Sequence, residues 1–219
     1  MKSETDIFED LRNRLIRGAF EYGSRLRAES LKKDYDCSAS TVREVLFRLS
    51  TLGLVDFQEQ RGFRMPERSL ERQHDITQMR IMLESEGACR SIRLGGVAWE
   101  ARLTAAHHQL SHIESRMSGM GPVAELPDLW MKAELEFHQT LISACGSELL
   151  QQMHMGVYHQ FRQQLLDVDR GFENLAENIV QHKTILDAAV AGDETGVRQA
   201  VHDHFARHLA PAAREGVPA

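Results

Sequence analysis

The second half of the chain repeats histidine and carboxylate residues at helical spacing. Glu134 and His138 lie four residues apart, so on a helix both side chains point the same way. His182 and His204 each fall on the apolar stripe of a predicted helix and therefore face its buried side. Imidazole and carboxylate groups suit Zn²⁺, Ni²⁺, Mn²⁺ or Fe²⁺. These four residues form a candidate site for a divalent metal ion. A buried histidine that only makes a hydrogen bond is the alternative at each position.

A second chemical pattern lies in residues 38–49, where hydroxyl side chains open a predicted helix. Ser40, Thr41 and Arg43 fall near its start, outside the face made by the apolar residues Val42, Val45, Leu46 and Leu49. A helix of this kind suits the DNA major groove, where its first residues reach base edges and its N-terminus attracts phosphate. An ordinary capped helix has the same pattern, so the flanking elements must decide between the two.

The net charge of −6 is unevenly distributed along the 219 residues. Residues 1–66 carry twelve Lys and Arg against eleven Asp and Glu, whereas residues 67–219 carry fourteen against twenty-one. Phosphate binding is therefore expected only in the first third of the chain. There it requires a local basic patch rather than a general positive field.

The composition is that of an ordinary globular protein with room for one large domain or two modest ones. The first ten residues contain four acids and no apolar run, unlike a signal peptide, and no apolar stretch is long enough to span a bilayer. The three cysteines are widely spaced without a CxxC pair, as expected for free thiols in a reducing cytosol. We therefore expect a cytoplasmic protein with no membrane partner.

The elements around residues 38–49 complete a DNA-binding arrangement. Apolar spacing predicts helices at about 6–17 and 28–35, with a tight turn before the third helix. Residues 54–58 and 62–65 have the pattern of two hairpin strands, with Arg61 and Gly62 at the tip. Helix, helix-turn-helix and hairpin together predict a winged helix-turn-helix. The tip could reach a minor groove or phosphate, or its glycine could simply serve the turn.

All of the chain beyond a break at residues 66–69 has the pattern of helices. We expect them near 70–94, 97–117, 128–145, 148–167, 172–191 and 193–210, separated by turns that mostly contain glycine. The predicted fold class is mainly α: an N-terminal winged helix-turn-helix plus a C-terminal all-helical bundle. We assign residues 1–66 to the DNA-binding domain, 67–70 to a linker and 71–219 to the helical domain.

Residues 7–65 resemble the DNA-binding domain of GntR-family transcription regulators. The order VREVL…RLS…GLV…RGF, from Val42 to Phe63, carries the resemblance. In that family, the hydroxyls and arginine of the recognition helix and the tip of the wing contact the operator. The resemblance implies contacts to double-stranded DNA from Ser38, Ser40, Thr41, Arg43, Arg61 and Gly62.

Residues 70–210 resemble the all-helical FCD effector domain of the FadR subgroup of that family. The resemblance rests on motifs that include Phe137-His138, the run from Ala144 to Ser147, His182 and His204. It implies a divalent metal held by Glu134, His138, His182 and His204, with Glu where most members have Asp. It also implies an arginine that holds an organic acid beside the metal. The first candidate is Arg80, whose alternative role is a surface ion pair with Glu84, and the second is Arg162.

These resemblances imply a homodimeric transcription regulator, most often a repressor, whose operator affinity responds to a metal and a small carboxylate effector. A looser similarity around Trp99 and Trp130 to a branch with CsiR-type regulators, linked to glutarate catabolism, favours a small dicarboxylate. Two alternatives are a metal-responsive regulator without an organic effector and a metal-dependent enzyme fused to a winged helix. The chain has no separate nucleophile or acid–base motif, so we expect a regulator rather than an enzyme.

Overall fold

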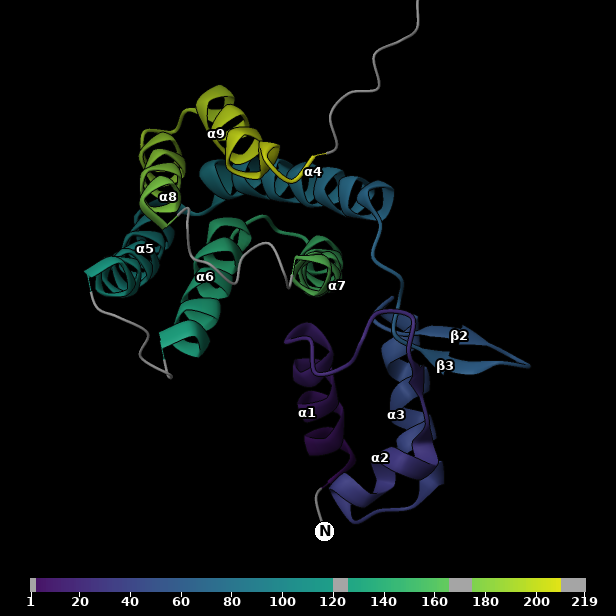
Figure 1. Cartoon of the computed structure of the whole chain (residues 1–219). Helices are drawn as coiled ribbons and strands as arrows, with labels where there is room; N and C mark the ends of the chain where they lie inside the picture. Colours follow the sequence, from purple (N-terminus) through teal and green to yellow (C-terminus); the bar gives the residue numbers. More distant parts are fainter. Residues whose placement is uncertain (1–2, 120–125, 166–174, 210–219) are drawn as a thin grey trace, which may run out of the picture. The chain divides into compact units, whose positions relative to one another are not determined.

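The structure is a computed structural model that describes residues 3–119, 126–165 and 175–209. It confirms the mainly α fold class, with one small sheet in the N-terminal part and long helices after it (Figure 1). Contacts divide the chain into two compact units. The first contains Met1–Ile76 and Gly156–Arg170, and the second contains Thr77–Met155 and Gly171–Ala219.

The first unit begins with three helices, α1 (Glu4–Ile16), α2 (Ala28–Tyr35) and α3 (Ala39–Thr51). Ser3 caps α1 in a capping box, in which its hydroxyl accepts from the Asp6 amide and the Asp6 carboxylate accepts from the Ser3 amide. Ser38 caps α3 by accepting from the amide of Thr41. The chain turns sharply between α2 and α3 because Asp36 adopts a left-handed conformation with φ of 50°.

A three-stranded antiparallel sheet completes this part of the first unit, in the order β1 (Arg25–Leu26), β3 (Gly62–Arg64), β2 (Asp56–Gln58). Phe63 pairs with Leu26 on one side and with Phe57 on the other, which joins the hairpin to the segment before α2. Helices and hairpin share one core that includes Ile7, Leu11, Leu31, Val45, Leu46, Leu49, Leu54 and Phe63. These elements form a winged helix-turn-helix in which β2 and β3 are the wing.

The second unit is helical over its described residues. It contains most of α4 (Leu70–Leu94), then α5 (Gly96–Gly119), α6 (Leu126–Ile142), the first half of α7 (Glu148–Gln164), α8 (Leu175–Val190) and α9 (Glu194–Ala206). The second half of α7 belongs to the first unit, where Nε2 of Gln163 donates to the Leu54 carbonyl at 3.0 Å.

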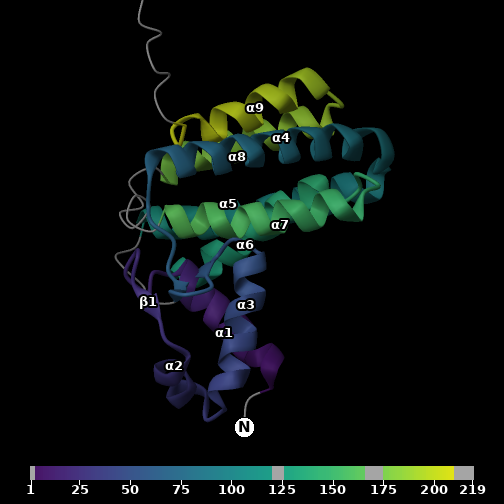
Figure 2. The same ribbon diagram turned by 90° about the vertical axis from the view of Figure 1, so that its right-hand side faces the viewer.

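Helices α4, α8 and α9 lie on one side of the second unit, and α5 and α6 lie on the other (Figure 2). An ion pair of 2.9 Å between Arg198 and Glu86 joins α9 to α4. Gly87 lets α4 and α6 approach closely, because a Cβ there would lie 2.7 Å from Cγ2 of Ile142. Glu84 and His138 stand one turn earlier on these two helices, so the close approach brings their side chains together.

Most observed boundaries lie within a few residues of the predicted ones. The ranges of α2 and α4 coincide with the prediction, whereas α1 begins two residues early because Ser3 supplies its cap. β2 begins at residue 56 and not 54, since Leu54 and Val55 are buried in the core outside the strand ladder. The predicted helix residues 166–167, 172–174 and 210 lie outside the described residues. Within the described ranges, none of the helices combines the length and apolar character needed to cross a bilayer.

Candidate DNA-binding surface and metal centre

The predicted operator contacts of the recognition helix lie at the start of α3. Ser38, Ser40 and Arg43 are exposed, and Thr41 is half-buried. The hydroxyls of Ser38 and Thr41 lie 2.9 Å apart, and the Ser38 hydroxyl also accepts from the Thr41 amide. These two hydroxyls are therefore engaged at the helix cap. Ser40 and Arg43 are exposed and take no part in these two cap contacts.

The wing tip presents Arg61 and Gly62 between β2 and β3. Arg61 is exposed. Gly62 has a φ of 74°, and a Cβ there would meet nothing within 4 Å, so the backbone conformation and not the space favours glycine. The tip thus carries an exposed guanidinium on a tight turn, which suits contact with phosphate or a minor groove.

Three buried histidines converge inside the second unit from three helices. His138 of α6, His182 of α8 and His204 of α9 each place a ring nitrogen within 4.8 Å of the other two. The rings of His182 and His204 are the closer pair, with centroids 4.6 Å apart. Glu134, one turn before His138 on α6, places Oε1 3.5 Å from Nε2 of His138. The fold therefore brings together the four residues whose spacing predicted a metal site.

Burial favours the neutral form of two of these imidazoles. Burial lowers the pKa of His138 although the Glu84 carboxylate lies beside it. Burial also lowers the pKa of His204 well below its ordinary value, and the neighbouring His182, His138 and Arg80 lower it further. A neutral imidazole offers the lone pair that ligates a metal. Among the described residues, Nε2 of His138 and both ring nitrogens of His182 have no hydrogen-bond partner, which fits side chains that ligate a cation.

Arg80 of α4 lies fully buried between two carboxylates and an aromatic ring. Its Nε donates to Oε1 of Glu84 at 2.7 Å, and its Nη2 donates to Oε1 of Glu134 at 3.1 Å. The guanidinium carbon lies 4.3 Å from the centroid of the Phe205 ring. The ion pair with Glu84 expected at the surface is thus part of the interior, because the helices packed around α4 exclude solvent from both side chains.

Glu84 is the centre of this buried network. Beside Arg80, it contacts Nδ1 of His138 at 2.7 Å through Oε2 and Nε2 of His154 at 2.9 Å through Oε1. Burial by itself would raise the pKa of Glu84, but the adjacent His138 ring, the Arg80 guanidinium and the hydrogen bonds from His138 and His154 hold the pKa well below its ordinary value. Glu84 is therefore an ionised acceptor that connects α4, α6 and α7.

Both the winged helix-turn-helix and the helical unit match the models of known protein families. The model of the FCD domain matches residues 75–207, which is more than half of the chain. The model of bacterial regulatory proteins of the gntR family matches residues 4–65. The chain belongs to the GntR family.

Individual relatives of this GntR-family chain are named as transcription regulators. It is 33% identical over 213 residues to the HTH-type transcriptional regulator BphR of Paraburkholderia xenovorans, across 96% of this chain and 85% of that protein. It is 28% identical over 208 residues to the HTH-type transcriptional repressor GlaR of Escherichia coli, across 91% of each. The solved structure of Escherichia coli McbR/YncC shares the fold, with a TM-score of 0.73 and 20% identity over 94% of this chain and 95% of that one. The chain is a DNA-binding transcription regulator, which confirms the expectation of a regulator rather than an enzyme.

The two predicted effector arginines of this GntR-family protein fall in different units. Arg80 lies beside the histidine cluster, whereas Arg162 is half-buried on the second half of α7 and belongs to the first unit. His154 of α7 is a further residue of the network that was not among the candidate site residues: it is fully buried and bonded to Glu84. Its burial has a sequence signal, because His154 stands four residues after Leu150 on the buried face of α7.

Glu114 of α5 is a site residue that the sequence analysis missed. Its Oε1 accepts from Nε1 of Trp130 at 3.2 Å and lies 3.3 Å from Nδ1 of His182. Glu114 stands four residues after Leu110 on the buried face of α5, so helical spacing could have found it. Gln181 was also missed, although its Oε1 lies 3.0 Å from Nδ1 of His204. It stands off the apolar stripe of α8, and no spacing signal marks it.

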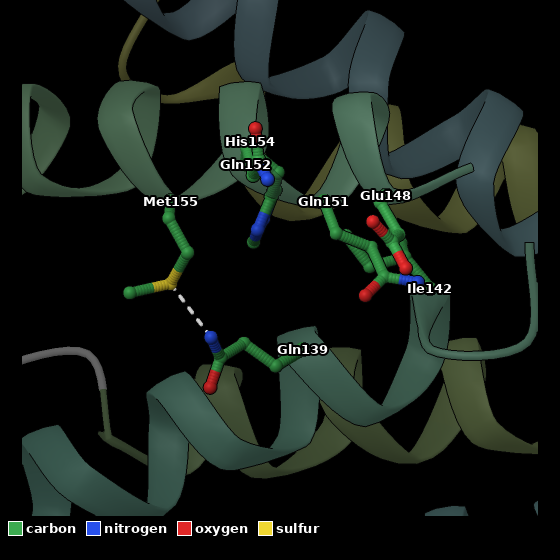
Figure 3. Close-up of a pocket in the computed structure, with 7 residues that line it drawn as sticks. All are labelled: Gln139, Ile142, Glu148, Gln151, Gln152, His154 and Met155. Carbon is green, nitrogen blue, oxygen red and sulfur yellow. Dashed lines mark hydrogen bonds between the residues drawn. The ribbon is translucent and has the colours of Figure 1, made fainter.

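A groove of about 280 Å³ lies between α6 and the first half of α7 (Figure 3). The side chains of Gln139 and Met155 point toward each other across it, and Nε2 of Gln139 donates to Sδ of Met155 at 2.6 Å. His154 lines this groove and also contacts Glu84, so one side chain links the groove to the buried network. The other lining residues are Ile142, Glu148, Gln151 and Gln152.

Proposed function

We propose that this transcription regulator senses a divalent metal together with a small carboxylate, and that binding of both changes its affinity for the operator. Glu134, His138, His182 and His204 would hold the metal. The observation that carries the proposal is the convergence of three buried imidazole nitrogens within 4.8 Å of one another. Bound there, Zn²⁺, Ni²⁺, Mn²⁺ or Fe²⁺ would supply a cationic centre for an anionic metabolite.

The charges around the cluster support a cation. Among the described residues, three buried carboxyl groups lie around the cluster: Glu84 and Glu134 pair with the Arg80 guanidinium, and Glu114 lies beside His182. Buried charges need partners, because desolvation costs several kcal/mol for each ion in typical proteins. A divalent ion would offset the excess of buried carboxylates. Three neutral histidines that only make hydrogen bonds would not offset this excess, because they carry no charge.

Arg80 is the proposed partner of the effector carboxylate. Oε1 of Glu134 contacts Nη2 of Arg80 at 3.1 Å and lies 3.5 Å from Nε2 of His138. If Glu134 ligates the metal, it moves from the guanidinium toward the cation, and Nη2 becomes available to an incoming carboxylate. Arg162 is the second proposed contact. The similarity to CsiR-type regulators makes a small dicarboxylate the first class to test.

The first domain would bind a short pseudo-palindromic operator as part of a homodimer, because one recognition helix reads only a few base pairs. We propose Ser38, Ser40, Thr41, Arg43, Arg61 and Gly62 as the operator-contacting set. We also propose domains at 1–66 and 71–219 with a linker at 67–70, membership of the FadR subgroup, action as a repressor, and the bacterial cytoplasm as the compartment.

A second candidate function is a metal-responsive regulator without an organic effector. The observation that favours it is the position of Arg80, which already contacts two carboxylates of the protein. In that case Arg80 would serve only to balance Glu84 and Glu134.

A thermal-shift screen separates these functions. Metal-loaded and chelator-treated protein would be melted against small mono-, di- and hydroxycarboxylates. A ligand at 100 times its Kd raises the free energy of unfolding by about 2.7 kcal/mol. An acid that stabilises only the metal-loaded protein, and does so less in Arg80→Lys, supports the first function. Lysine keeps the charge but loses the two-pronged contact, so this variant is gentler than Arg80→Ala.

Two other outcomes of this screen would contradict the first function. Stabilisation by metal with no response to any acid favours the metal-responsive regulator. No stabilisation by any of the four metals means that the buried polar cluster is structural, and the proposed metal site is then wrong.

A further inference from the structure

Each histidine of the cluster turns the same ring nitrogen toward an oxygen on another helix. Nδ1 of His138 lies 2.7 Å from Oε2 of Glu84 on α4. Nδ1 of His182 lies 3.3 Å from Oε1 of Glu114 on α5, and Nδ1 of His204 lies 3.0 Å from Oε1 of Gln181 on α8. This shared orientation leaves Nε2 of each ring on the side away from its acceptor.

The orientation of the Gln181 amide identifies the tautomer of His204. Nε2 of Gln181 donates to Oε1 of Glu177 at 2.9 Å, one turn earlier on α8. The amide oxygen is therefore the atom that faces His204, and an amide oxygen can only accept a hydrogen bond. The proton of the neutral His204 ring must then lie on Nδ1, which leaves the lone pair on Nε2.

The same reasoning applies to His138 beside Glu84. The Glu84 carboxylate forms a buried ion pair with the Arg80 guanidinium through Oε1 at 2.7 Å, and a carboxylate in such a pair can only accept. Its Oε2 faces Nδ1 of His138, which must donate the proton. For His182 the contact is looser: Oε1 of Glu114 accepts from the indole Nε1–H of Trp130 at 3.2 Å and lies 3.3 Å from Nδ1, near it but outside hydrogen-bond geometry.

We propose that Glu84, Glu114 and Gln181 are positioning residues, which hold the three imidazoles with the proton on Nδ1 and thereby present three Nε2 lone pairs to the metal. This inference rests on the proposed metal-binding function of the cluster. Acceptors behind a ligating histidine fix its tautomer and ring orientation and raise its basicity. Each of these three lies on a helix other than the one that carries its histidine, so the metal geometry would depend on the packing of five helices, α4, α5, α6, α8 and α9.

Gln181 offers the sharpest test because it is only half-buried and carries no charge. The probe is Co²⁺, titrated into the metal-free full-length protein and followed by its visible d–d absorption. We expect Gln181→Met, which keeps the length but removes the acceptor, to weaken Co²⁺ binding by about 10–100-fold and to shift the absorption. Gln181→Glu restores an acceptor and should keep the affinity within a few-fold of the wild type.

Gln199→Met is the matched control. Gln199 also bonds a carboxylate four residues away, through Nε2 to Oδ1 of Asp203 at 2.8 Å, but it is exposed on α9. This variant should bind Co²⁺ with wild-type affinity and spectrum. Glu114→Leu is the second variant, expected to weaken Co²⁺ binding through His182, and thermal melting of each metal-free variant verifies that it is folded.

The outcomes distinguish the positioning role of these residues from the metal-binding function on which that role rests. Wild-type affinity and an unchanged spectrum in both Gln181→Met and Glu114→Leu would overturn the positioning role while leaving the metal site in place. Equal weakening in Gln181→Met and Gln181→Glu would also overturn it, because the acceptor is then not what matters. Failure of the wild-type protein to bind Co²⁺ and all four of Zn²⁺, Ni²⁺, Mn²⁺ and Fe²⁺ would instead overturn the proposed metal function.

Discussion

The role of an arginine in this protein follows from what its guanidinium already contacts. Arg48 of α3 donates to Oε1 of Glu4 at 2.9 Å and lies 4.5 Å above the Phe8 ring, so it joins α3 to α1. Arg80 lies buried between carboxylates. Arg43 is exposed at the start of the same α3 helix. Exposure at the start of a recognition helix is what a base or phosphate contact requires.

Replacing Arg43 with alanine should therefore weaken operator binding. A lost arginine contact to a base edge costs about 1–3 kcal/mol in typical complexes. The measurement is a binding titration on operator DNA at several salt concentrations. Arg48→Ala is the control on the same helix: it should lower the melting temperature slightly and leave operator affinity near that of the wild type. Unchanged affinity of Arg43→Ala at all salt concentrations would show that Arg43 does not contact DNA.

The combined change His182→Ala plus His204→Ala should abolish metal binding. Two of three converging imidazoles are lost, and His138 with Glu134 cannot complete a site. Elemental analysis of purified protein gives the metal content, and circular dichroism verifies the fold. His202→Ala is the matched control, because His202 stands next to this site on α9 but its side chain is half exposed. Full metal content in the folded double variant would contradict the assignment.

At the scale of elements, partly buried polar contacts join helices whose ends can be predicted from the sequence. Tyr35, the last residue of α2, donates to Oδ2 of Asp10 at 2.7 Å and accepts from Nη1 of Arg14 at 3.0 Å, both on α1. Arg14 also bonds Asp34 at 2.9 Å. This network fixes the angle between α1 and α2, and therefore the position of α3 after the turn at Asp36.

The pH dependence of this contact is testable at high pH. Burial and the hydrogen bond to Asp10 raise the pKa of Tyr35 to about 12, from its ordinary value of 10.0. The folded state keeps the proton above pH 10 while the unfolded chain loses it. The contribution of Tyr35 to stability is thus fully present below pH 10 and is lost as the pH rises toward about 12.

Urea unfolding of the wild type and Tyr35→Phe measures that contribution. At pH 7 the variant should be less stable by about 1.5–3 kcal/mol, the usual range for a hydrogen bond to a charged group. The difference between the two proteins should shrink as the pH rises from 10 toward 12. A difference that stays constant over this interval would mean that Tyr35 titrates at its ordinary pKa in the folded protein.

Caps and apolar spacing explain why so many elements could be predicted from the sequence. The range of α4 follows from its apolar face and the breaks around it, and α3 follows from the cap at Ser38. The partners of polar side chains could not be predicted in the same way. Whether Glu84 pairs at the surface or in the core depends on how closely α6 packs at Gly87. The role of Gln181 depends on a histidine of the next helix, 23 positions away.

At the scale of the whole molecule, regulation is a thermodynamic coupling between two binding events. A ligand of the helical unit changes operator affinity only if it binds the DNA-competent and DNA-incompetent arrangements unequally. The coupling is reciprocal, so operator DNA must change the affinity for metal by the same factor. This equality holds whatever path connects the sites, and it can be tested without knowing the organic effector.

We therefore expect metal loading to change operator affinity by about 5–150-fold, which corresponds to typical couplings of 1–3 kcal/mol. Operator DNA should change the Zn²⁺ affinity of the full-length protein by the same factor, measured by competition with a chelating dye. The His182→Ala plus His204→Ala variant should bind the operator with an affinity that ignores Zn²⁺. If Zn²⁺ binds the wild type tightly yet leaves operator affinity unchanged, the metal is structural. The regulatory signal must then come from the carboxylate alone, because a ligand with equal affinity for both arrangements shifts nothing.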